Sequence, residues 1–357
     1  PMSTLFLDFV GAATVRVDDA PPELDRHLRS RVPLFFRDAL PDGVPPAVHF
    51  RSASAQDLAG WGDWEVDAPY GMVPALHQAR RAVACRYRGA VDLVLVPGEP
   101  IEVLFRRHRK CAGRLYGALL VTLHLALRRR GALLVHAAAV ADERRCLLLA
   151  GLRGSRKTQI LLTLLRDGWG YLADDKVILS SGRVHLFQTL VGLADHHLAS
   201  LPWLGARSRK GASGVGRKVR TTIASLSAKL LPRQLLPAAT RVLDPVAFLD
   251  VHDLFPGCPV VRERAVDAVA LLGPGDALAA APCGRAEAIQ ELAGVQEMFF
   301  HDLDPLDRLL AHFSPSAPPP IAAVLDAALP SSVAFFRVGL PARCAVDEAA
   351  RLVALLR

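Results

Sequence analysis

Short apolar runs that alternate with polar residues fill the first hundred or so positions of the chain, a pattern typical of strands. Proline- and glycine-rich pieces separate these runs, among them Pro41–Pro46 and the turn-forming Pro97–Pro100. The pattern predicts a β-rich N-terminal region over residues 1–115. Its expected strands include Leu5–Leu7, Thr14–Val17, Val48–Phe50, Arg86–Arg88, Val91–Val96 and Ile101–Phe105.

The spacing of the apolar residues changes after the last of these strands, where residues four positions apart become apolar. Leu115, Leu119 and Leu123 lie on one face of a helix that we expect to end near Gly131. The apolar stretch Leu115–Leu127 is shorter than the ~20 residues that a membrane span needs. We therefore expect a buried helix and no membrane partner.

Strands and helices alternate through the rest of the chain, which is typical of an α/β domain. The sequence predicts such a domain over residues 116–357, with helices at about Lys157–Arg166 and Asp347–Leu356 and a proline-rich loop at Ser314–Pro320. The apolar run Ala132–Val140 is expected to form one strand. Further strands are expected at Cys146–Ala150, Trp169–Ala173, Val177–Leu179, Val184–Phe187, Val266–Leu272 and Val333–Val338.

The composition suits a globular protein with a substantial core. Of the 357 residues, 51% are hydrophobic and 22% are charged, which excludes disorder of the whole chain. No basic segment followed by an apolar block opens the sequence, so we expect no secretory signal and a cytoplasmic protein. The six cysteines lie far apart, without the Cys-x-x-Cys pairs of zinc sites, and we expect them to be reduced thiols.

The net charge of +8 is concentrated in two basic runs, Arg106–Lys110 and Arg207–Arg220. Such runs suit nucleic acid, an acidic peptide or the phosphate groups of a substrate, and they also occur on solvated surfaces without a partner. Aromatic residues make up only 6% of the chain and do not interleave with these runs, which argues against a base-stacking surface. Nucleic acid is therefore the least favoured of these partners.

One segment carries a phosphate-binding pattern. The sequence GLRGSRKT follows the expected strand Cys146–Ala150 and leads into an expected helix. In a phosphate-binding loop, backbone N–H groups and the positive end of the helix converge on phosphate oxygens, a lysine neutralises their charge and a hydroxyl binds Mg²⁺. We therefore expect a nucleoside triphosphate to contact Gly151, Arg153, Gly154, Ser155, Arg156, Lys157 and Thr158, with Thr158 as a ligand of Mg²⁺.

Arg156 departs from this pattern, because the position before the lysine is ordinarily glycine. Glycine there permits a close backbone approach to the phosphates and a positive φ angle. With a negative φ, the arginine side chain can point outward or add charge to the phosphate site; with a positive φ, the loop is strained and binds weakly. The sequence leaves both conformations open, and a chance match of so short a motif is a further alternative.

Two adjacent acids, Asp174 and Asp175, directly follow the expected strand Trp169–Ala173. In a parallel α/β sheet they belong at the carboxyl edge beside the phosphate loop, where ligands bind. One carboxylate there can hold Mg²⁺, and the other can accept the proton of an attacking hydroxyl in phosphoryl transfer. A solvated turn is the alternative, but the acids lead straight into the apolar Val177–Leu179, an unfavourable place for idle charges.

His136 lies in the middle of the expected strand Ala132–Val140. A lone histidine on an apolar strand is usually a hydrogen-bonded core residue, and no other histidine has a spacing that indicates chemistry. The sequence also lacks the Gly-x-Ser-x-Gly elbow of Ser/His/Asp hydrolases and the His-Glu-x-x-His motif of zinc enzymes. Neither of these enzyme classes is expected.

Taken together, these segments resemble the catalytic domain of the HPr kinase/phosphorylase family. The resemblance covers about Gly131–Val184 and consists of a strand bearing His136-Ala137, the phosphate loop, and a Gly-Trp turn that leads to the acid pair. Phe335–Pro341 and the helix expected after it are similar to the closing strand and helix of the family's shorter relatives. Residues 1–110 show no such similarity.

The resemblance implies an α/β fold with a P-loop of the HPr kinase-like, phosphoenolpyruvate carboxykinase-like type, and ATP-dependent transfer of a phosphoryl group to a hydroxyl. Lys157 and Thr158 would then take the nucleotide phosphates and Mg²⁺. Asp174 and Asp175 would share the duties of base and metal ligand, with Asp175 on the metal, and His136 would lie near the transferred phosphate.

Relatives with an unrelated N-terminal module modify a serine of ribosomally made precursor peptides, lasso peptides among them, and the family's founding member forms hexamers. The resemblance therefore implies a peptide or protein substrate and a homo-oligomer.

A kinase that acts on a peptide or protein hydroxyl is the leading hypothesis, with the N-terminal region and the basic run Arg207–Arg220 gripping the substrate. One alternative is a nucleotide-binding module without catalysis, in which Arg156 marks a degenerate loop. A second is a kinase of small-molecule hydroxyls, since a fold does not fix its acceptor. A third is a nucleic-acid-binding protein, whose affinity would fall steeply with salt.

Overall fold

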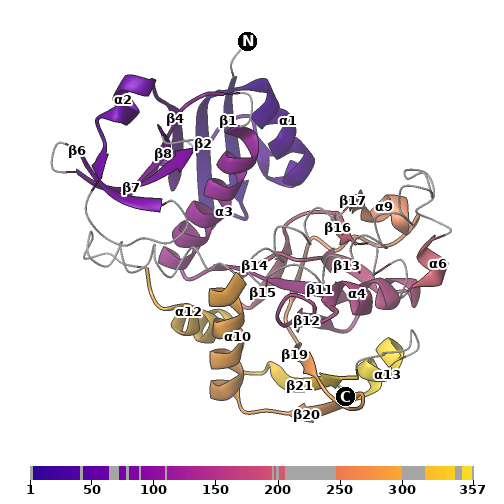
Figure 1. Ribbon diagram of the computed structural model, residues 1–357. Helices are drawn as coiled ribbons and strands as arrows, with labels where there is room; N and C mark the ends of the chain where they lie inside the picture. The colour runs from indigo at the N-terminus through magenta and orange to yellow at the C-terminus, as the bar shows by residue number, and fades with distance from the viewer. Residues whose placement is uncertain are drawn as a thin grey trace, which may run out of the picture. The chain divides into compact units, whose positions relative to one another are not determined.

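The computed structural model describes residues 3–40, 43–63, 72–77, 80–87, 90–108, 111–194, 197, 201–205, 247–299, 318–341 and 348–355 (Figure 1). The chain divides into two compact units. Unit 1 comprises residues 1–136, 178–188 and 285–333, and unit 2 comprises residues 137–177, 189–284 and 334–357. No single cut separates them, and the predicted division into residues 1–115 and 116–357 stays a prediction. The basic run 207–220 and most of the predicted loop 314–320 lie outside the described residues.

A nine-stranded sheet dominates the N-terminal part of unit 1, with the strand order β3-β1-β2-β4-β9-β8-β7-β6-β5. β4 runs parallel to both β2 and β9, and the other neighbours are antiparallel. The strands predicted for this region are confirmed, since they fall on β1, β2, β4, β7, β8 and β9; only Arg88, the last residue of the strand expected at Arg86–Arg88, lies outside the described residues. The strands are β1 (Ser3–Phe9), β2 (Ala13–Ala20), β3 (Phe36–Arg37), β4 (Val48–Ser52), β5 (Gly62–Asp63), β6 (Met72–His77), β7 (Arg80–Tyr87), β8 (Ala90–Val96) and β9 (Ile101–Phe105).

Helices α1 (Pro22–Arg31) and α3 (Cys111–Arg129) pack together on one face of this sheet. Strand residues alternate between the two faces: Leu95 belongs to the apolar cluster under these helices, and its neighbour Val94 belongs to a second cluster under α2 (Ala55–Ala59). The predicted helix is therefore confirmed as the buried α3. Within the described part of the chain, no helix has both the length and the apolar character that a membrane crossing needs.

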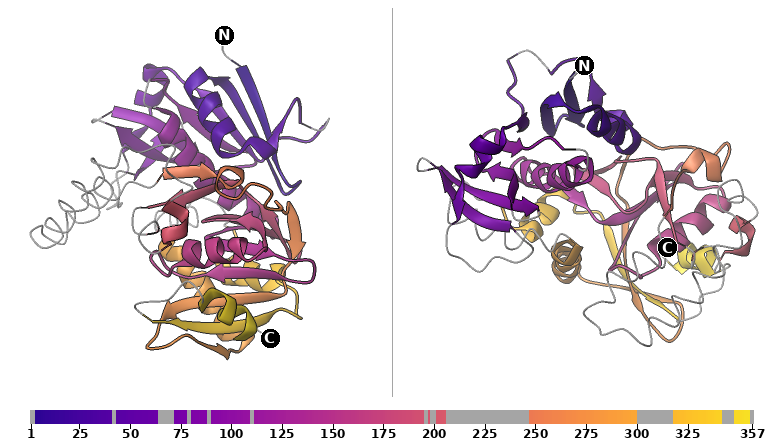
Figure 2. Two further views of the ribbon diagram at one scale, coloured as in Figure 1. Left: turned by 90° about the vertical axis from the view of Figure 1, so that its right-hand side faces the viewer. Right: turned by 45° about the horizontal axis from the view of Figure 1, so that its top comes forward.

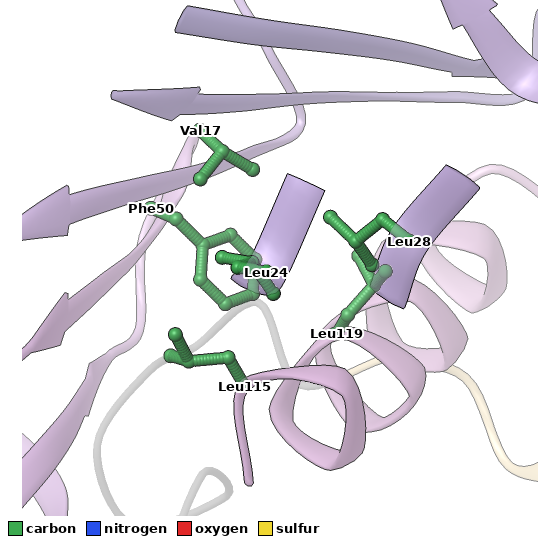
Figure 3. Close-up of a pocket in the computed structure, with 6 residues that line it drawn as sticks. All are labelled: Val17, Leu24, Leu28, Phe50, Leu115 and Leu119. Carbon is green, nitrogen blue, oxygen red and sulfur yellow. The ribbon is translucent and has the colours of Figure 1, made fainter. Parts of the chain in front are cut away.

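A small apolar pocket lies between α1, α3 and the sheet (Figure 3). Each helix contributes two leucines four residues apart, which places both of them on the same helix face. Because only apolar side chains line the pocket, it is a packing gap in the core and not a polar binding site. The lining residues are Val17 of β2, Phe50 of β4, Leu24 and Leu28 of α1, and Leu115 and Leu119 of α3.

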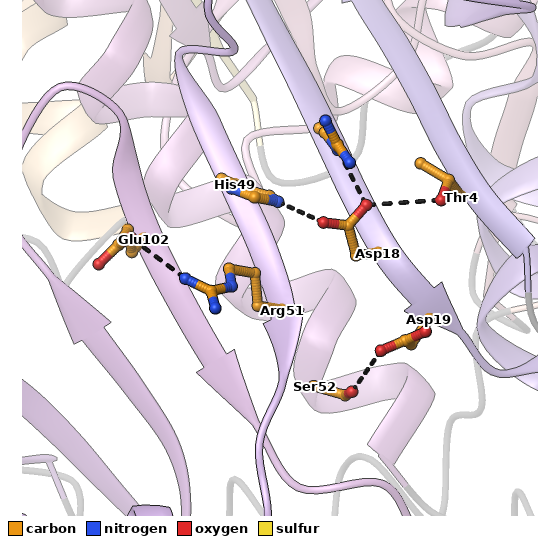
Figure 4. Close-up of polar contacts among 8 residues, drawn as sticks. Thr4, Asp18, Asp19, His49, Arg51, Ser52 and Glu102 are labelled. Carbon is orange, nitrogen blue, oxygen red and sulfur yellow. Dashed lines mark hydrogen bonds and ion pairs between the residues drawn. The ribbon is translucent and has the colours of Figure 1, made fainter.

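The opposite face of β2, β4 and β9 carries paired polar side chains (Figure 4). Asp18 of β2 accepts a hydrogen bond from Arg16 Nε at 2.8 Å, and its second oxygen lies 2.7 Å from His49 Nε2 of β4. Arg51 of β4 lies 3.7 Å from Glu102 of β9. Burial raises the pKa of Asp18, but the hydrogen bonds from Arg16 and His49 outweigh it and hold this pKa below its ordinary value. These charges satisfy one another across the strands.

Later segments of the chain complete unit 1. β10 (Leu133–Val135), β14 (Val177–Ser180) and β15 (Arg183–Leu186) are successive strands of one sheet. Two helices, α10 (Arg285–Phe299) and α12 (Ile321–Ala328), pack against each other. The predicted strands at Val177–Leu179 and Val184–Phe187 are thereby confirmed, whereas the sequence pattern does not predict α10 or α12.

Unit 2 is built on a six-stranded sheet with the order β13-β11-β12-β19-β21-β20. β12, β19 and β21 run parallel to one another, and β11 runs antiparallel to both β12 and β13. β12 and β13 therefore point in the same direction, and their carboxyl ends lie at the same edge of the sheet. The strands are β11 (Ala137–Ala141), β12 (Cys146–Ala150), β13 (Gly170–Ala173), β19 (Ala268–Pro274), β20 (Ala279–Pro282) and β21 (Ala334–Leu340).

Two helices of unit 2 confirm their predictions. α4 (Lys157–Arg166) follows β12, and α13 (Glu348–Leu355) packs against α4, with both helices toward the viewer in the left panel of Figure 2. β16 (Leu190–Leu193) and β17 (Ala247–Asp250) pair as an antiparallel ribbon. The remaining elements of unit 2 are α6 (Pro202–Gly205), α9 (Val251–Leu254) and β18 (Glu263–Ala265).

Two expectations about the α/β region are wrong. The apolar run Ala132–Val140 is not one strand, because the chain leaves the strand conformation at His136, and β10 and β11 belong to different units. The sheet that carries the acid pair is mixed and not parallel, because β11 lies between β12 and β13 and runs against both. The fold class is nevertheless α/β, as predicted.

Candidate functional site

The phosphate-loop segment connects β12 to α4 at the carboxyl edge of the unit 2 sheet. Gly151, the first residue after β12, lies so close to its neighbours that a Cβ atom there would come within 2.6 Å of both the Leu272 carbonyl oxygen and Ser155 Oγ. Only glycine therefore fits at this position. Gly154 has a φ of +85°, a conformation that residues with a side chain rarely adopt.

Arg156 has a φ of 66° and a ψ of 21° and is the N-cap residue of α4. Of the two conformations that the sequence leaves open, the chain thus adopts the one with positive φ. A residue with a side chain is strained by about 1–2 kcal/mol in this left-handed region. The guanidinium donates a hydrogen bond from Nη1 to the carbonyl oxygen of Pro341 at 2.6 Å. Arg156 is therefore strained in its backbone but held by its side chain.

Lys157 is the first residue of α4 and is 7% exposed. Its Nζ donates hydrogen bonds to the carbonyl oxygens of Gly151 at 2.7 Å and Leu152 at 3.1 Å. Burial lowers the pKa of Lys157 to about 8, although the charges of Asp175 and Asp174 act in the opposite direction. The ammonium group is thus held against the backbone of the loop, in a place where an anion would favour its charged form.

Asp174 follows β13 and lies beside the start of α4, because β12 and β13 end at the same edge of the sheet. The Thr158 hydroxyl donates to Asp174 Oδ1 at 2.9 Å, and the Gly192 amide of β16 donates to Oδ2 at 3.0 Å. Asp174 is only 2% exposed. Burial raises its pKa to about 6 and the charge of Asp175 adds to the rise, while the two hydrogen bonds and Lys157 limit it.

Asp175 differs from its neighbour in both backbone and surroundings. Its φ is 71°, its side chain is 36% exposed, and it forms an ion pair with Lys176. Asp174 is therefore a buried acid attached to the loop helix, whereas Asp175 is partly exposed and paired with a lysine. Adjacent acids in such different environments are typical of sites where one carboxyl group exchanges a proton and the other carries charge.

Ser155 Oγ is buried and has no hydrogen-bond partner among the described atoms. Buried hydroxyl groups without a partner are rare in folded proteins and call for an explanation. The same oxygen lies close to the Cα position of Gly151, where no side chain fits. A phosphate oxygen would supply the missing partner, which makes the loop chemically suited to the predicted ligand. Arg153, the remaining predicted contact, is exposed.

His136 belongs to unit 1 and is 4% exposed. Its backbone amide donates to Gln296 Oε1 at 2.5 Å. Its ring stacks on that of Phe299, with the ring centroids 3.7 Å apart and the planes at 5°. These contacts with α10 fix both the backbone and the ring of His136, and its closeness to a transferred phosphate stays a prediction.

The sequence does not predict three residues that form hydrogen bonds with the candidate site residues. Gly192 and Pro341 contact the site through backbone atoms. Because almost every residue type has these atoms, the amino-acid type does not indicate such a contact. Gln296 contacts His136 across 160 positions of sequence, so no local pattern indicates the pair. A single sequence carries no signal that could have found any of the three.

Among the residues that the structure describes, no three His, Cys, Asp or Glu side chains form a group that could hold a metal ion. Mg²⁺ in phosphoryl-transfer sites takes only one or two carboxylates and completes its shell with water and substrate phosphates. Thr158 and Asp175 are side chains that could supply such a partial site in unit 2, since one lies in the first turn of α4 and the other is partly exposed.

Comparisons with known proteins give no further guide to the site. No family model matches the chain, and no curated protein matches its sequence. The function is therefore inferred from the residues and their geometry.

Proposed function

We propose that this protein is an ATP- and Mg²⁺-dependent kinase that transfers the γ-phosphoryl group to a serine or threonine hydroxyl of a peptide or protein. The hydrogen bond between Thr158 and Asp174 carries the proposal, because it joins the helix that follows the loop to the first acid of the pair. A loop suited to phosphate and a candidate base are thus neighbours within one compact unit. The resemblance to the HPr kinase/phosphorylase family supports the same reaction and the same type of fold.

The loop and α4 offer the donors that the phosphates of ATP need. Because α4 begins at Lys157, its unpaired N–H groups and the positive end of its dipole adjoin the loop. When the nucleotide binds, Lys157 exchanges the carbonyl oxygens of Gly151 and Leu152 for the outer phosphates. Ser155 Oγ gains the partner that it lacks without nucleotide. Phosphate charge then keeps Lys157 protonated in spite of its burial.

The two acids take different parts in the transfer. Thr158 and Asp175 would hold Mg²⁺, which would neutralise charge on the phosphates. Asp174, whose pKa is raised to about 6, is close to the optimum for a base that works near neutral pH. The oxygen of the acceptor hydroxyl attacks the γ-phosphorus, its proton passes to Asp174, and ADP leaves with the electrons of the broken P–O bond.

The distribution of charge favours an acidic peptide or protein as the acceptor. Residues 206–246 hold nine of the 43 basic residues and one of the 35 acidic residues, so this stretch of sequence alone accounts for the net charge of +8. β17, which follows this stretch in the sequence, pairs with β16, and Gly192 of β16 donates to the candidate base. Concentrated positive charge raises the rate of encounter with an acidic partner.

A nucleotide-binding module without catalysis is the second candidate. The positive φ of Arg156 favours it, because backbone strain before the lysine weakens a phosphate loop unless something compensates for it. This candidate predicts that ATP binds and that no peptide or small-molecule hydroxyl is phosphorylated.

Mass spectrometry of the products tests the proposal. The protein is incubated with ATP, Mg²⁺ and the serine-containing peptides encoded beside its gene, and we expect the mass of one phosphate to be added to a peptide. Lys157→Ala should lower the rate by roughly 10²–10³-fold, and Asp174→Asn and Asp175→Asn should abolish transfer. Arg166→Ala, at the far end of α4, is the matched control and should retain the activity. Normal turnover in the first three variants would refute the assignments.

A further inference from the structure

Arg156 connects three elements of unit 2. Its carbonyl oxygen accepts the first hydrogen bond of α4, from the Ile160 amide at 3.0 Å. Its side chain donates to the Pro341 carbonyl oxygen at 2.6 Å, a charge-assisted bond because the guanidinium is ionised. Its neighbour Ser155 closes a turn of the loop on the Leu152 carbonyl oxygen at 3.0 Å. The loop, its helix and the end of β21 therefore meet at this one residue.

Pro341, the partner of Arg156, lies at the end of a well-paired strand. It follows β21, which pairs in register with β19 along its whole length. The Leu340 carbonyl oxygen accepts the Gly275 amide at 2.9 Å. Gly275 approaches the strand so closely that a Cβ atom on it would lie 2.8 Å from the Gly339 Cα. β19, β20 and Gly275 thus hold the end of β21, which can anchor the Arg156 side chain.

The order of the strands explains why an arginine is suited to this link. β12 is parallel to β19, and β19 is parallel to β21, so the loop after β12 and the residue after β21 leave from the same edge of the sheet. These two strands are separated by one other strand, which corresponds to about 10 Å. A long side chain with a donor at its end is needed to bridge that separation. Glycine has no side chain and cannot form the link.

We propose that Arg156 is a positioning residue for Lys157, whose guanidinium ties the phosphate loop to the end of β21. The tether holds the left-handed backbone that glycine supplies in the ordinary form of the motif. The tether itself is a property of the nucleotide-free chain; only its consequence for MgATP rests on the proposed function. The opposing view is that Arg156 is a defect, which replacement by glycine would repair.

Three substitutions separate the tether from the strain. Arg156→Gly removes both, Arg156→Ala removes the tether and keeps the strain, and Arg156→Lys keeps the strain and one donor. Ser181→Gly is a matched control, because Ser181 is exposed in the turn between β14 and β15 and also has a positive φ, of 48°, with no tether of this kind. This control measures the effect of removing backbone strain without removing a tether.

Hydrogen exchange of the nucleotide-free protein is the direct readout, followed at the Ser155 and Ile160 amides, which are hydrogen-bonded in the loop and the first turn of α4. We expect exchange to be roughly 30-fold faster in Arg156→Ala and roughly fivefold faster in Arg156→Gly, with Arg156→Lys closest to the wild type. Ser181→Gly should leave these amides unchanged. Slower exchange in Arg156→Gly than in the wild type, or equal rates in all variants, would overturn the inference.

Calorimetric titration with MgATP tests the consequence for the ligand. The Kd should rise in the same order, with lysine rescuing most of the affinity, and in the transfer assay the change should lie in KM for ATP and not in kcat. Tighter binding by Arg156→Gly would contradict the tether. Absence of MgATP binding by the wild-type protein would instead contradict the proposed function, and the exchange rates would still decide on the tether.

Discussion

Because the Asp174 carboxylate is buried, we predict that its charge lowers the free energy of unfolding and that removal of the charge stabilises the fold. The pKa of Asp174 is raised by burial from 3.8 to about 6, so between these values the folded state binds the proton more tightly than the unfolded chain. The free energy of unfolding therefore falls as the pH rises from about 4 to about 6. The rise in pKa corresponds to a penalty of about 3 kcal/mol on the ionised carboxylate above pH 6.

Asp174→Asn removes this charge and keeps both hydrogen bonds. The amide oxygen can accept from the Gly192 amide, and the amide nitrogen can donate to Thr158 Oγ1, because a hydroxyl accepts as well as donates. Since the side chain is buried, solvent screening reduces the effect little. We expect the free energy of unfolding to increase by about 2–3 kcal/mol at pH 8 and to change by less than about 0.5 kcal/mol at pH 4.

Urea unfolding at pH 4, 6 and 8 measures this difference. Asp253→Asn is a suitable control, because Asp253 is exposed in α9 and its replacement changes no buried charge. Asp174→Asn should also lose phosphoryl transfer, so that its stability rises while its activity falls. A difference in stability that is independent of pH, or an Asp174→Asn protein that is less stable than the wild type at pH 8, would refute the reasoning.

Three further outcomes are expected. Leu28→Ala should lower the free energy of unfolding by about 2–5 kcal/mol in thermal or urea melts, because it enlarges an existing apolar gap, whereas Val17→Ile should leave it unchanged or raise it by up to about 1 kcal/mol. Gln296→Leu should destabilise the protein by about 1–3 kcal/mol, since the buried His136 amide loses its acceptor; equal melts would count against that hydrogen bond. Lys157→Met should lower the rate of phosphoryl transfer by roughly 10²–10³-fold, as Lys157→Ala does, and transfer at the wild-type rate would show that the ammonium is not needed.

Local patterns in the sequence were enough for the elements that carry the site. The apolar run from Ile160 to Leu165 predicts α4, and the apolar run Cys146–Ala150 predicts β12. Both patterns involve only residues that are close together in the sequence. The proximity of Asp174 to the loop was also predictable, since each follows a strand that ends at the carboxyl edge. That expectation holds although the sheet is mixed, because β11 reverses direction on both sides.

The remaining features depend on partners far away in the sequence. The direction of β11 is set by pairing, and the break of the strand at His136 accompanies its contacts with α10, so neither follows from the apolar run Ala132–Val140. The sign of φ at Arg156 is coupled to a carbonyl group 185 positions later. By contrast, α1 was not predicted although local signals for it are present. It has a proline in the first turn and leucines four residues apart, but the segments around it have a strand-like pattern.

Calorimetric titration of the protein with MgATP tests the central claim most directly, since every step of the proposed reaction begins with phosphate held by the loop and Lys157. We expect the wild-type protein and Arg166→Ala to bind one nucleotide per chain, and Lys157→Ala to bind it roughly 100-fold more weakly. Absence of binding by the wild-type protein, or equal affinity in Lys157→Ala, would contradict the account.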